Sequence, residues 1–313
     1  MRKNINASVT EINKLVKDAY KKEGAAIMGD DDRVNPVYIS TGSVSLNKAL
    51  GGKGLACGRI SVFFGDWSTG KTTVALMTIA NAQKNGLMCA YVDVERTFEP
   101  AWATKMGVDV SELLVYATSC GEEAVDVIEK LLSDGFGMIV VDSIASLVPT
   151  VEIEDPASKQ QMGLRAKLVK KLINKVNARN TGTLVLFLNQ VQERIGILYG
   201  NPEYQPGGKA LMFNSSVQVR FSKGEHLVEE GEKIGRVVKA VVTKNKLAPP
   251  LQVAQFNLLF KEGIDRGEEL FRNKLLDGSI IQKGGWYLFT VDETQVQGKE
   301  AAIERCKEEI NGS

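Results

Sequence analysis

A chain of 313 residues and 34.1 kDa can bury one sizeable core but is too short for several large domains. Hydrophobic residues make up 43% and charged residues 25% of it, which excludes disorder as the main state. With 39 basic and 38 acidic residues the net charge is +1, so the chain does not coat a polyanion through bulk charge. Any contact with nucleic acid must therefore be local.

Membrane and metal chemistry have little support in the composition. No apolar stretch approaches the roughly 20 residues that a bilayer demands, and no apolar run follows the first basic residues as in a secretion signal. The four cysteines form no CxxC pair, and the only histidine is His226. We therefore expect no zinc site, no disulfide framework and no membrane partner, and a reducing, cytoplasmic compartment.

The first predicted element is an amphipathic helix over residues 8–20. Ser8 and Glu11 have the spacing of a capping box, and apolar residues recur on one helical face after them. An isolated helix of about 12–15 residues barely forms in water, so this face must dock. Burial in its own core is one possibility. The polar run from Gly29 to Arg33 separates it from the next element and favours a neighbouring subunit, so residues 1–32 are interpreted as a docking helix and linker.

From Ile60 onward short apolar runs alternate with helical stretches. This repetition predicts an α/β fold with a mostly parallel central sheet, covered on both faces, with ligands at the carboxyl ends of the strands. A β-rich block then completes a core of residues 33–265, and residues 266–313 are expected to form a small C-terminal α+β segment that closes with a helix from Lys299 to Ile310. The predicted strands are Ile60–Phe64, Ala90–Val94, Val115–Thr118, Met138–Val141, Leu184–Leu188, Val217–Phe221, Val237–Thr243 and Val253–Leu259.

A phosphate-binding loop follows the first of these strands. The segment Gly65–Thr72 matches GxxxxGK[ST] and precedes a helical run, a setting that disfavours the alternative of a simple glycine turn. Glycines let successive backbone N–H groups point inward, and the helix N-terminus adds partial positive charge. Lys71 is expected to bridge β- and γ-phosphate oxygens and Thr72 to offer its hydroxyl to Mg²⁺. The expected nucleotide-binding residues here are Gly65, Asp66, Trp67, Ser68, Thr69, Gly70, Lys71, Thr72 and Thr73.

Carboxylates end two further apolar runs. Asp142 closes Met138–Val141 and is expected to hold the metal ion through a water, although a strand that meets a turn is the plainer interpretation. Asp93 and Glu95 end another strand, and alternation puts both on the same side. Glu95 lies nearer the carboxyl end, so we assign it as the general base that orients the attacking water for γ-phosphate cleavage.

Together with Ser40–Ser43, Asn189–Gln190 and Gly200–Gly208, these segments closely resemble the bacterial RecA recombinases, in the family's order and over nearly the whole chain. Such proteins form ATP-dependent helical filaments on single-stranded DNA, search for a homologous duplex and exchange strands in recombinational repair and the SOS response. The resemblance implies a RecA-type P-loop ATPase core with ATP and Mg²⁺ as cofactors. It implies single-stranded DNA, homologous duplex DNA and further copies of the chain as partners. The short C-terminal segment lacks the family's acidic tail, which favours a phage-encoded or minimal member.

The resemblance also assigns roles around the nucleotide. Gln190 is implied to sense the γ-phosphate and to order the loop that follows it. Glu99 and Trp102 match positions near the adenine, although large aromatic residues are as often packed in a core. Lys244 and Lys246 are implied to reach ATP held by the adjacent subunit, and their period-two spacing puts both on one side of an extended segment. Lysine protection of an edge strand is the alternative for this pair.

One departure from the family concerns the nucleotide. Arg266 and Gly267 stand where relatives commonly have aromatic residues near the neighbouring adenine, so that contact is expected to be missing.

A second interpretation of the chain is a nucleotide-gated DNA-binding scaffold that hydrolyses little ATP. A third is a ring-forming ATPase motor, which the long loop after Gln190 disfavours.

The first DNA-binding loop implied by the resemblance covers residues 152–163. After it, Arg165–Arg179 contains no acidic residue and gathers several lysines on one helical face, which is a credible phosphate track, although solvated helices often carry lysines. Amide groups at the start of this helix would add donors. The expected DNA-binding residues of this region are Met162, Gly163, Arg165 and Lys167.

The second implied loop covers residues 191–209. Arg194 offers a phosphate contact, and Ile195 matches the residue that the family inserts between base triplets. Gln192, Glu193 and Pro206 depart from the family pattern and leave DNA affinity open. The expected DNA-binding residues here are Arg194, Ile195, Tyr199, Gly207 and Gly208.

Overall fold

The computed structural model describes residues 5–20, 36–154, 163–193 and 203–311. It separates into two compact units, Met1–Val37 and Tyr38–Ser313. Helix α1 (Ile5–Tyr20) lies in the first unit and begins before Ser8, so Ser8 is inside the helix and the predicted capping box is wrong. The side chains of Ile12 and Leu15 are 49% and 68% exposed, and the docking of this helix on a neighbouring subunit stays a prediction. No helix among the described residues is long and apolar enough to cross a membrane.

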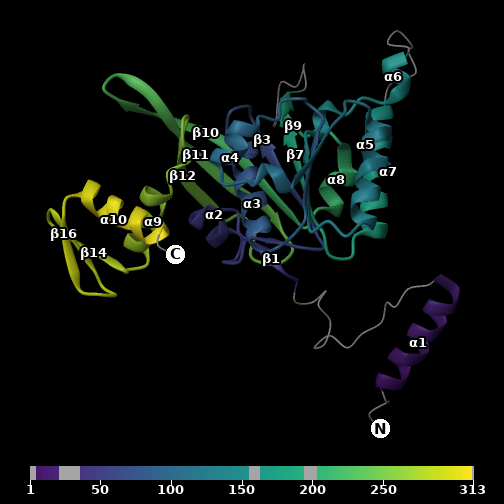
Figure 1. The fold of residues 1–313 in the computed structure, drawn as a ribbon, viewed down its shortest axis with the longest axis horizontal. Coiled ribbons are helices and arrows are strands. Elements are labelled where there is room, and N and C mark those ends of the chain that lie inside the picture. Colours follow the sequence, from purple (N-terminus) through teal and green to yellow (C-terminus); the bar gives the residue numbers. More distant parts are fainter. Residues whose placement is uncertain (1–4, 21–35, 155–162, 194–202, 312–313) are drawn as a thin grey trace. The chain divides into compact units, whose positions relative to one another are not determined.

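A nine-stranded sheet forms the centre of the second unit (Figure 1). Its order is β13-β12-β11-β10-β3-β7-β6-β4-β5; the strands from β10 to β5 are parallel, whereas β11, β12 and β13 are antiparallel additions. This confirms the mostly parallel sheet. The strands are β3 (Ile60–Gly65), β4 (Cys89–Asp93), β5 (Leu113–Ala117), β6 (Met138–Asp142), β7 (Leu184–Gln190), β10 (Val217–Glu229), β11 (Glu232–Asn245), β12 (Val253–Leu259) and β13 (Gly263–Ile264).

Helices cover both faces of this sheet, which explains why its parallel strands are apolar throughout. Alternation divides the side chains of β3 between two cores: Phe63 packs on one face, whereas Val62 and Phe64 pack on the other. The first face carries α2 (Val44–Ala49), α3 (Lys71–Lys84) and α4 (Pro100–Lys105), and the second carries α5 (Gly121–Ser133), α7 (Leu164–Arg179) and α8 (Gly208–Asn214). A short pair, β1 (Tyr38–Ile39) with β2 (Leu55–Ala56), precedes the sheet.

Strands β10 and β11 form a hairpin that extends beyond their neighbours (Figure 1). Its turn is made by Glu230 and Gly231, whose φ angles of 48° and 87° match the positive values that tight hairpin turns require. At the other end of the hairpin, β10 runs parallel to β3, with Phe221 opposite Gly65. Beyond that pair β10 continues into the hairpin, paired with β11.

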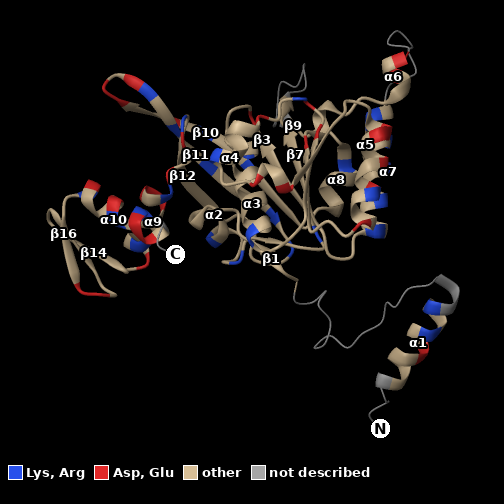
Figure 2. Cartoon of the chain, viewed as in Figure 1, with Lys and Arg blue, Asp and Glu red and all other residues tan. Residues whose placement is uncertain are grey.

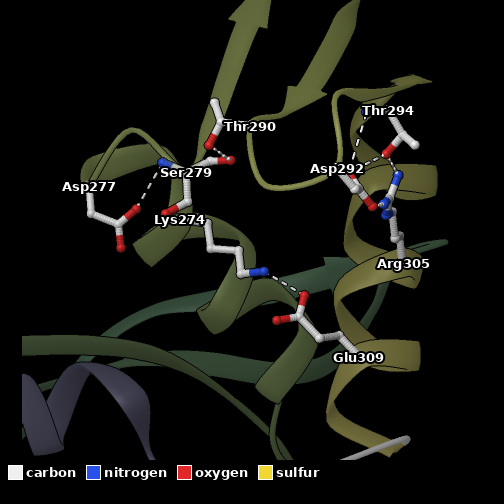
Figure 3. Close-up of polar contacts among 8 residues, drawn as sticks. All are labelled: Lys274, Asp277, Ser279, Thr290, Asp292, Thr294, Arg305 and Glu309. Atoms are coloured by element: carbon white, nitrogen blue, oxygen red, sulfur yellow. Dashed lines mark hydrogen bonds and ion pairs between the residues drawn. The ribbon is translucent and has the colours of Figure 1, made fainter.

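The C-terminal segment has a small core of its own, built around Phe271, Tyr287 and Phe289. Polar contacts fix its helices (Figure 3): Lys274 of α9 pairs with Glu309 of α10 at 2.5 Å, and Arg305 of α10 contacts Asp292. The predicted closing helix is confirmed. The elements are α9 (Arg266–Leu276), β14 (Ile280–Lys283), β15 (Trp286–Phe289), β16 (Thr294–Gln297) and α10 (Lys299–Asn311).

A buried carboxylate joins this segment to the sheet domain. Glu269 of α9 reaches the first turn of α2, where its Oε1 accepts from the Ser43 hydroxyl at 2.5 Å and from the Ser45 amide at 3.1 Å. Its Oε2 accepts from the Val44 amide at 3.1 Å. Burial raises the pKa of Glu269, and these donors oppose that rise. The contact satisfies amide groups that a helix N-terminus otherwise leaves unpaired.

Glu269→Ala is expected to lower the free energy of unfolding by about 2–4 kcal/mol, because one buried and two partly buried donors lose their acceptor. Glu269→Gln keeps one acceptor oxygen and should cost less. Urea unfolding followed by circular dichroism measures both changes, with Glu300→Ala at an exposed position of α10 as the control. Equal stability of the Glu269→Ala and control variants would contradict the role of this contact.

Candidate functional site

The phosphate loop has the strand–loop–helix geometry that its motif predicts. β3 ends at Gly65, and Gly70, with φ 80°, is the N-cap of α3. At Gly65, where φ is 143°, a Cβ would lie 2.0 Å from the Phe221 carbonyl oxygen, so only glycine fits there. The phosphate loop therefore starts where β10 lies too close to β3 for a side chain. Its backbone conformation depends on glycine at positions 65 and 70.

Lys71 lies at the first position of α3 with its ammonium group turned into the loop. Its Nζ donates to the carbonyl oxygens of Gly65 at 3.1 Å and Asp66 at 2.5 Å. Burial lowers the pKa of Lys71 to about 8, and the negative charges of Asp142, Asp66 and Glu95 oppose that change. A phosphate group would offer this cation a stronger acceptor than the loop's own carbonyls do.

Asp142 and Thr72 meet at the carboxyl end of the sheet. The Oδ2 of Asp142 accepts from the Thr72 hydroxyl at 3.0 Å and from the Tyr91 hydroxyl at 2.6 Å. Burial raises the pKa of Asp142, and the hydrogen bond from Tyr91 opposes this. A hydroxyl and a carboxylate are the oxygen donors that suit Mg²⁺ in a phosphate site, so the residues present fit that ion. Three or more His, Cys, Asp and Glu side chains do not gather as a metal site anywhere in the described ranges.

Glu95 lies just past β4 and is held by three donors. Its Oε1 accepts from the Ser143 hydroxyl at 2.5 Å, the Ser146 hydroxyl at 3.2 Å and the Gln190 amide at 2.9 Å. All three of these bonds go to the same oxygen. The other oxygen, Oε2, is thus the one suited to accept from a water molecule.

Both carboxylate oxygens of the neighbouring acid, Asp93, accept hydrogen bonds from backbone amides. Its Oδ1 accepts from the Thr97 amide at 3.1 Å, and its Oδ2 accepts from the Phe98 amide at 2.8 Å. The side chain is buried. Asp93 thus shapes the loop after β4, and this supports Glu95 as the better candidate base.

An aromatic cavity of about 380 Å³ adjoins the phosphate loop. Trp102 contributes to it while also packing against the sheet's first core. Phe260, which directly follows β12, lines the cavity too and was missed in the sequence, although an aromatic residue at a strand end was a visible signal. Glu99 caps α4 through the Ala101 amide at 3.3 Å. The lining residues are Trp67, Ser68, Gly70, Thr73, Trp102, Arg236, Leu258, Leu259 and Phe260.

A larger cavity of about 860 Å³ lies where α7 and α8 begin. Gly163 and Gly207, with φ 88° and 96°, are the N-caps of these helices and line it. Arg165 and Gly208 line it as well, so the structure brings four of the expected DNA-binding residues together. Met162, Arg194, Ile195 and Tyr199 lie outside the described residues.

The bases of both expected DNA loops have regular structure. Helix α6 (Thr150–Glu154) enters the first loop, and Glu152 accepts two hydrogen bonds from Arg165, at 3.1 and 2.5 Å. Strands β8 (Gln192–Glu193) and β9 (Glu203–Tyr204) pair at the base of the second. The buried Asn189 amide donates to the Pro206 carbonyl at 2.8 Å, so the two ends of the second loop are tied together.

Lys244 lies near the end of β11 and Lys246 directly follows the strand, and the two ammonium groups turn toward the same carbonyl oxygen, that of Phe213. The Lys244 ammonium donates to the carbonyl oxygens of Met212 at 2.6 Å and Phe213 at 3.1 Å, and that of Lys246 to Phe213 at 3.5 Å. Both cations therefore lie at the C-terminal end of α8, where they complement the helix dipole. Helix α8 begins at the large cavity and ends at these lysines.

Comparison with known proteins decides the family. The RecA N-terminal domain family model matches residues 3–265. Protein RecA of Thermus aquaticus is 39% identical over 312 residues, which cover 98% of this chain and 92% of that protein. Protein RecA of Mesoplasma florum is 38% identical over 302 residues, covering 96% and 90%. Protein RecA of Thermotoga neapolitana is 38% identical over 294 residues, covering 93% and 83%.

The chain belongs to the RecA family. As a RecA-family member it is a DNA-dependent ATPase and homologous recombinase that acts in DNA recombination and repair. This confirms the function expected from the sequence, and the alternative of a scaffold that hydrolyses little ATP is not favoured.

Part of the basic face of α7 is paired with acidic residues, so it is not the fully available phosphate-binding surface that the sequence suggested (Figure 2). Lys175 pairs with Glu129 and, at 3.0 Å, with Asp126, while Arg179 pairs with Glu129 at 2.5 Å. These acids belong to α5, so the absence of acids within α7 did not reveal them. Lys167 lines a shallow surface hollow on α7 outside the large cavity, beside Lys170 and Lys171.

Proposed function

We propose that this RecA-family protein binds ATP and Mg²⁺ in its phosphate loop and assembles as a helical filament on single-stranded DNA, which it pairs with a homologous duplex. Lys71 would contact the β- and γ-phosphates, Thr72 and Asp142 would hold the ion, the latter through a water, and Glu95 would orient the attacking water. When bound, Mg²⁺ neutralises charge that develops on the phosphate oxygens. Residues 1–32 dock on the neighbouring subunit.

One observation carries the link between nucleotide and DNA: the 2.9 Å hydrogen bond from Gln190 to Glu95. Gln190 is the last residue of β7, and the second expected DNA loop starts directly after it. A γ-phosphate near Glu95 would compete for the Gln190 amide and pull on the loop's first residue. The same side chain therefore responds to the triphosphate and positions the DNA loop.

The aromatic cavity binds the nucleotide base, and the large cavity binds DNA. The aromatic cavity takes the adenine, with Trp102 and Phe260 as faces for the base, and Glu99 caps the helix that carries Trp102. The large cavity takes the DNA backbone, because its helix N-terminal amides at Gly163 and Gly207 favour phosphate. To bind a DNA phosphate, the Arg165 guanidinium must first release the carboxylate of Glu152.

ATP turnover with and without single-stranded DNA tests this function. We expect turnover to rise at least about tenfold with DNA, which corresponds to a coupling within the usual range for linked sites. A Gln190→Ala variant should bind ATP but lose that stimulation. Equal turnover with and without DNA in the unaltered protein would overturn the proposed coupling.

Replacement of both Lys244 and Lys246 by alanine is expected to lower DNA-stimulated ATP turnover at least about tenfold, because two cations supplied across the filament interface would stabilise transition-state charge. Turnover at saturating DNA measures the effect, and Lys239→Ala on the exposed side of β11 is the control. A double variant as active as the control would count against catalysis across the interface.

A further inference from the structure

Strand β10 carries a lysine past the end of β3 and onto the phosphate loop. Phe221 of β10 lies opposite Gly65, the last residue of β3, and its ring packs on Phe63 with centroids 5.1 Å apart. Alternation puts Lys223 on the same face of the sheet as Phe221. Because α3 covers this face, Lys223 emerges beside the loop that joins β3 to α3.

The side chain of Lys223 contacts the ring of Trp67, a residue of the phosphate loop. The Lys223 ammonium lies 3.2 Å from the centroid of the Trp67 ring, which is well inside cation–π range. The Trp67 side chain is otherwise 72% exposed. The next residue, Ser68, has φ 55°, a left-handed conformation that costs a non-glycine residue energy. The contact therefore holds the outer part of the loop next to a residue with a strained backbone.

The contact also brings a second positive charge toward Lys71. Lys223 acts electrostatically on Lys71 and contributes to the lowered pKa of that group, after burial. Two cations that repel one another in this way gain jointly when a polyanion binds between or beside them. Trp67 also lines the aromatic cavity, so the triphosphate and base regions of the site meet at this ring.

We propose that Lys223, held against Trp67, is a positioning residue for the triphosphate: it supplies a second cation to the phosphate loop from the β10–β11 hairpin and fixes the loop's outer part. This inference rests on the proposed function, because it requires nucleotide in the loop. It predicts that the cation and the ring act as one unit in binding ATP.

A double-mutant cycle tests the inference in the full-length protein without DNA. Lys223→Met keeps the apolar stem and Trp67→Leu removes the ring; each should raise KM for ATP about three- to tenfold with little change in kcat. The double variant should be no worse than the poorer single variant, because either change breaks the same contact. Lys223→Arg should keep KM for ATP close to that of the unaltered protein, since a guanidinium also stacks on indole.

The controls separate this inference from the function on which it rests. Lys239→Met removes the same charge from the opposite face of the hairpin, next to Ser222, and should leave KM unchanged. If Lys223→Met matches Lys239→Met, or if the two single effects multiply in the double variant, the inference is overturned while ATP binding stands. If the unaltered protein binds no ATP, the proposed function itself falls. Tryptophan emission should shift in Lys223→Met and not in Lys239→Met, and identical spectra would contradict the contact.

Discussion

Glu95→Gln is expected to bind ATP normally and to lose about 10²–10⁴-fold in turnover, which is the usual contribution of a positioned general base. All three described donors to this side chain bond Oε1. A glutamine keeps a carbonyl oxygen for Ser143 and Gln190 but puts an amide where Oε2 would accept the proton of the attacking water. Binding and assembly therefore survive while the chemical step fails.

Single-turnover hydrolysis with saturating DNA measures this loss, and nucleotide affinity measured in parallel shows that the site is intact. Glu112→Gln makes the same chemical change at an exposed position and serves as the control. Turnover in Glu95→Gln equal to that of the control would refute the assignment of the base. Asp93→Asn would then be the next variant, although its backbone contacts make loss of folding its expected effect.

Lys71→Ala is expected to lower ATP affinity by roughly 10²-fold or more, because a buried ammonium that bonds phosphate oxygens is worth several kcal/mol. The variant should fold, since Lys71 donates chiefly to carbonyls of the surface loop and not to the core. Calorimetric titration with ATP and Mg²⁺ checks the affinity. Lys84→Ala, at the exposed far end of α3, is the matched control.

A small change in ATP affinity for Lys71→Ala would mean that the phosphate loop does not hold the triphosphate. The Lys223 proposal would fail with it. Retained affinity in Lys84→Ala together with loss in Lys71→Ala separates a local effect from a general loss of charge along α3.

The parts of this structure that the sequence predicts well are those with a local signal. Each strand from Ile60–Phe64 to Leu184–Leu188 is found to within two residues at either end, because an apolar run between turns identifies a buried parallel strand. The phosphate loop is a contiguous motif with a fixed setting. The positions of Lys71 and Thr72 at the start of α3 and of Glu95 after β4 follow from the same local signals, and their roles stay predictions.

The parts that escape the sequence are pairings across the fold. Glu269 contacts residues more than 220 positions earlier in the chain, and nothing in its local pattern points to the start of α2. Tyr91 lies in an apolar strand, so only the pairing of β4 with β6 reveals that its hydroxyl bonds Asp142. The acids that neutralise part of α7 lie on another helix. The order of strands and helices in space makes these contacts, and the local sequence pattern does not say which particular side chains become neighbours.

The central claim is that a triphosphate near Glu95 changes how the loop after Gln190 holds DNA. Anisotropy of a labelled single-stranded oligonucleotide, with a nonhydrolysable ATP analogue and without nucleotide, measures it most directly. We expect affinity to rise at least about tenfold with the analogue, and this rise to vanish in Gln190→Ala. Equal affinity for the oligonucleotide with and without the analogue in the unaltered protein would contradict the account.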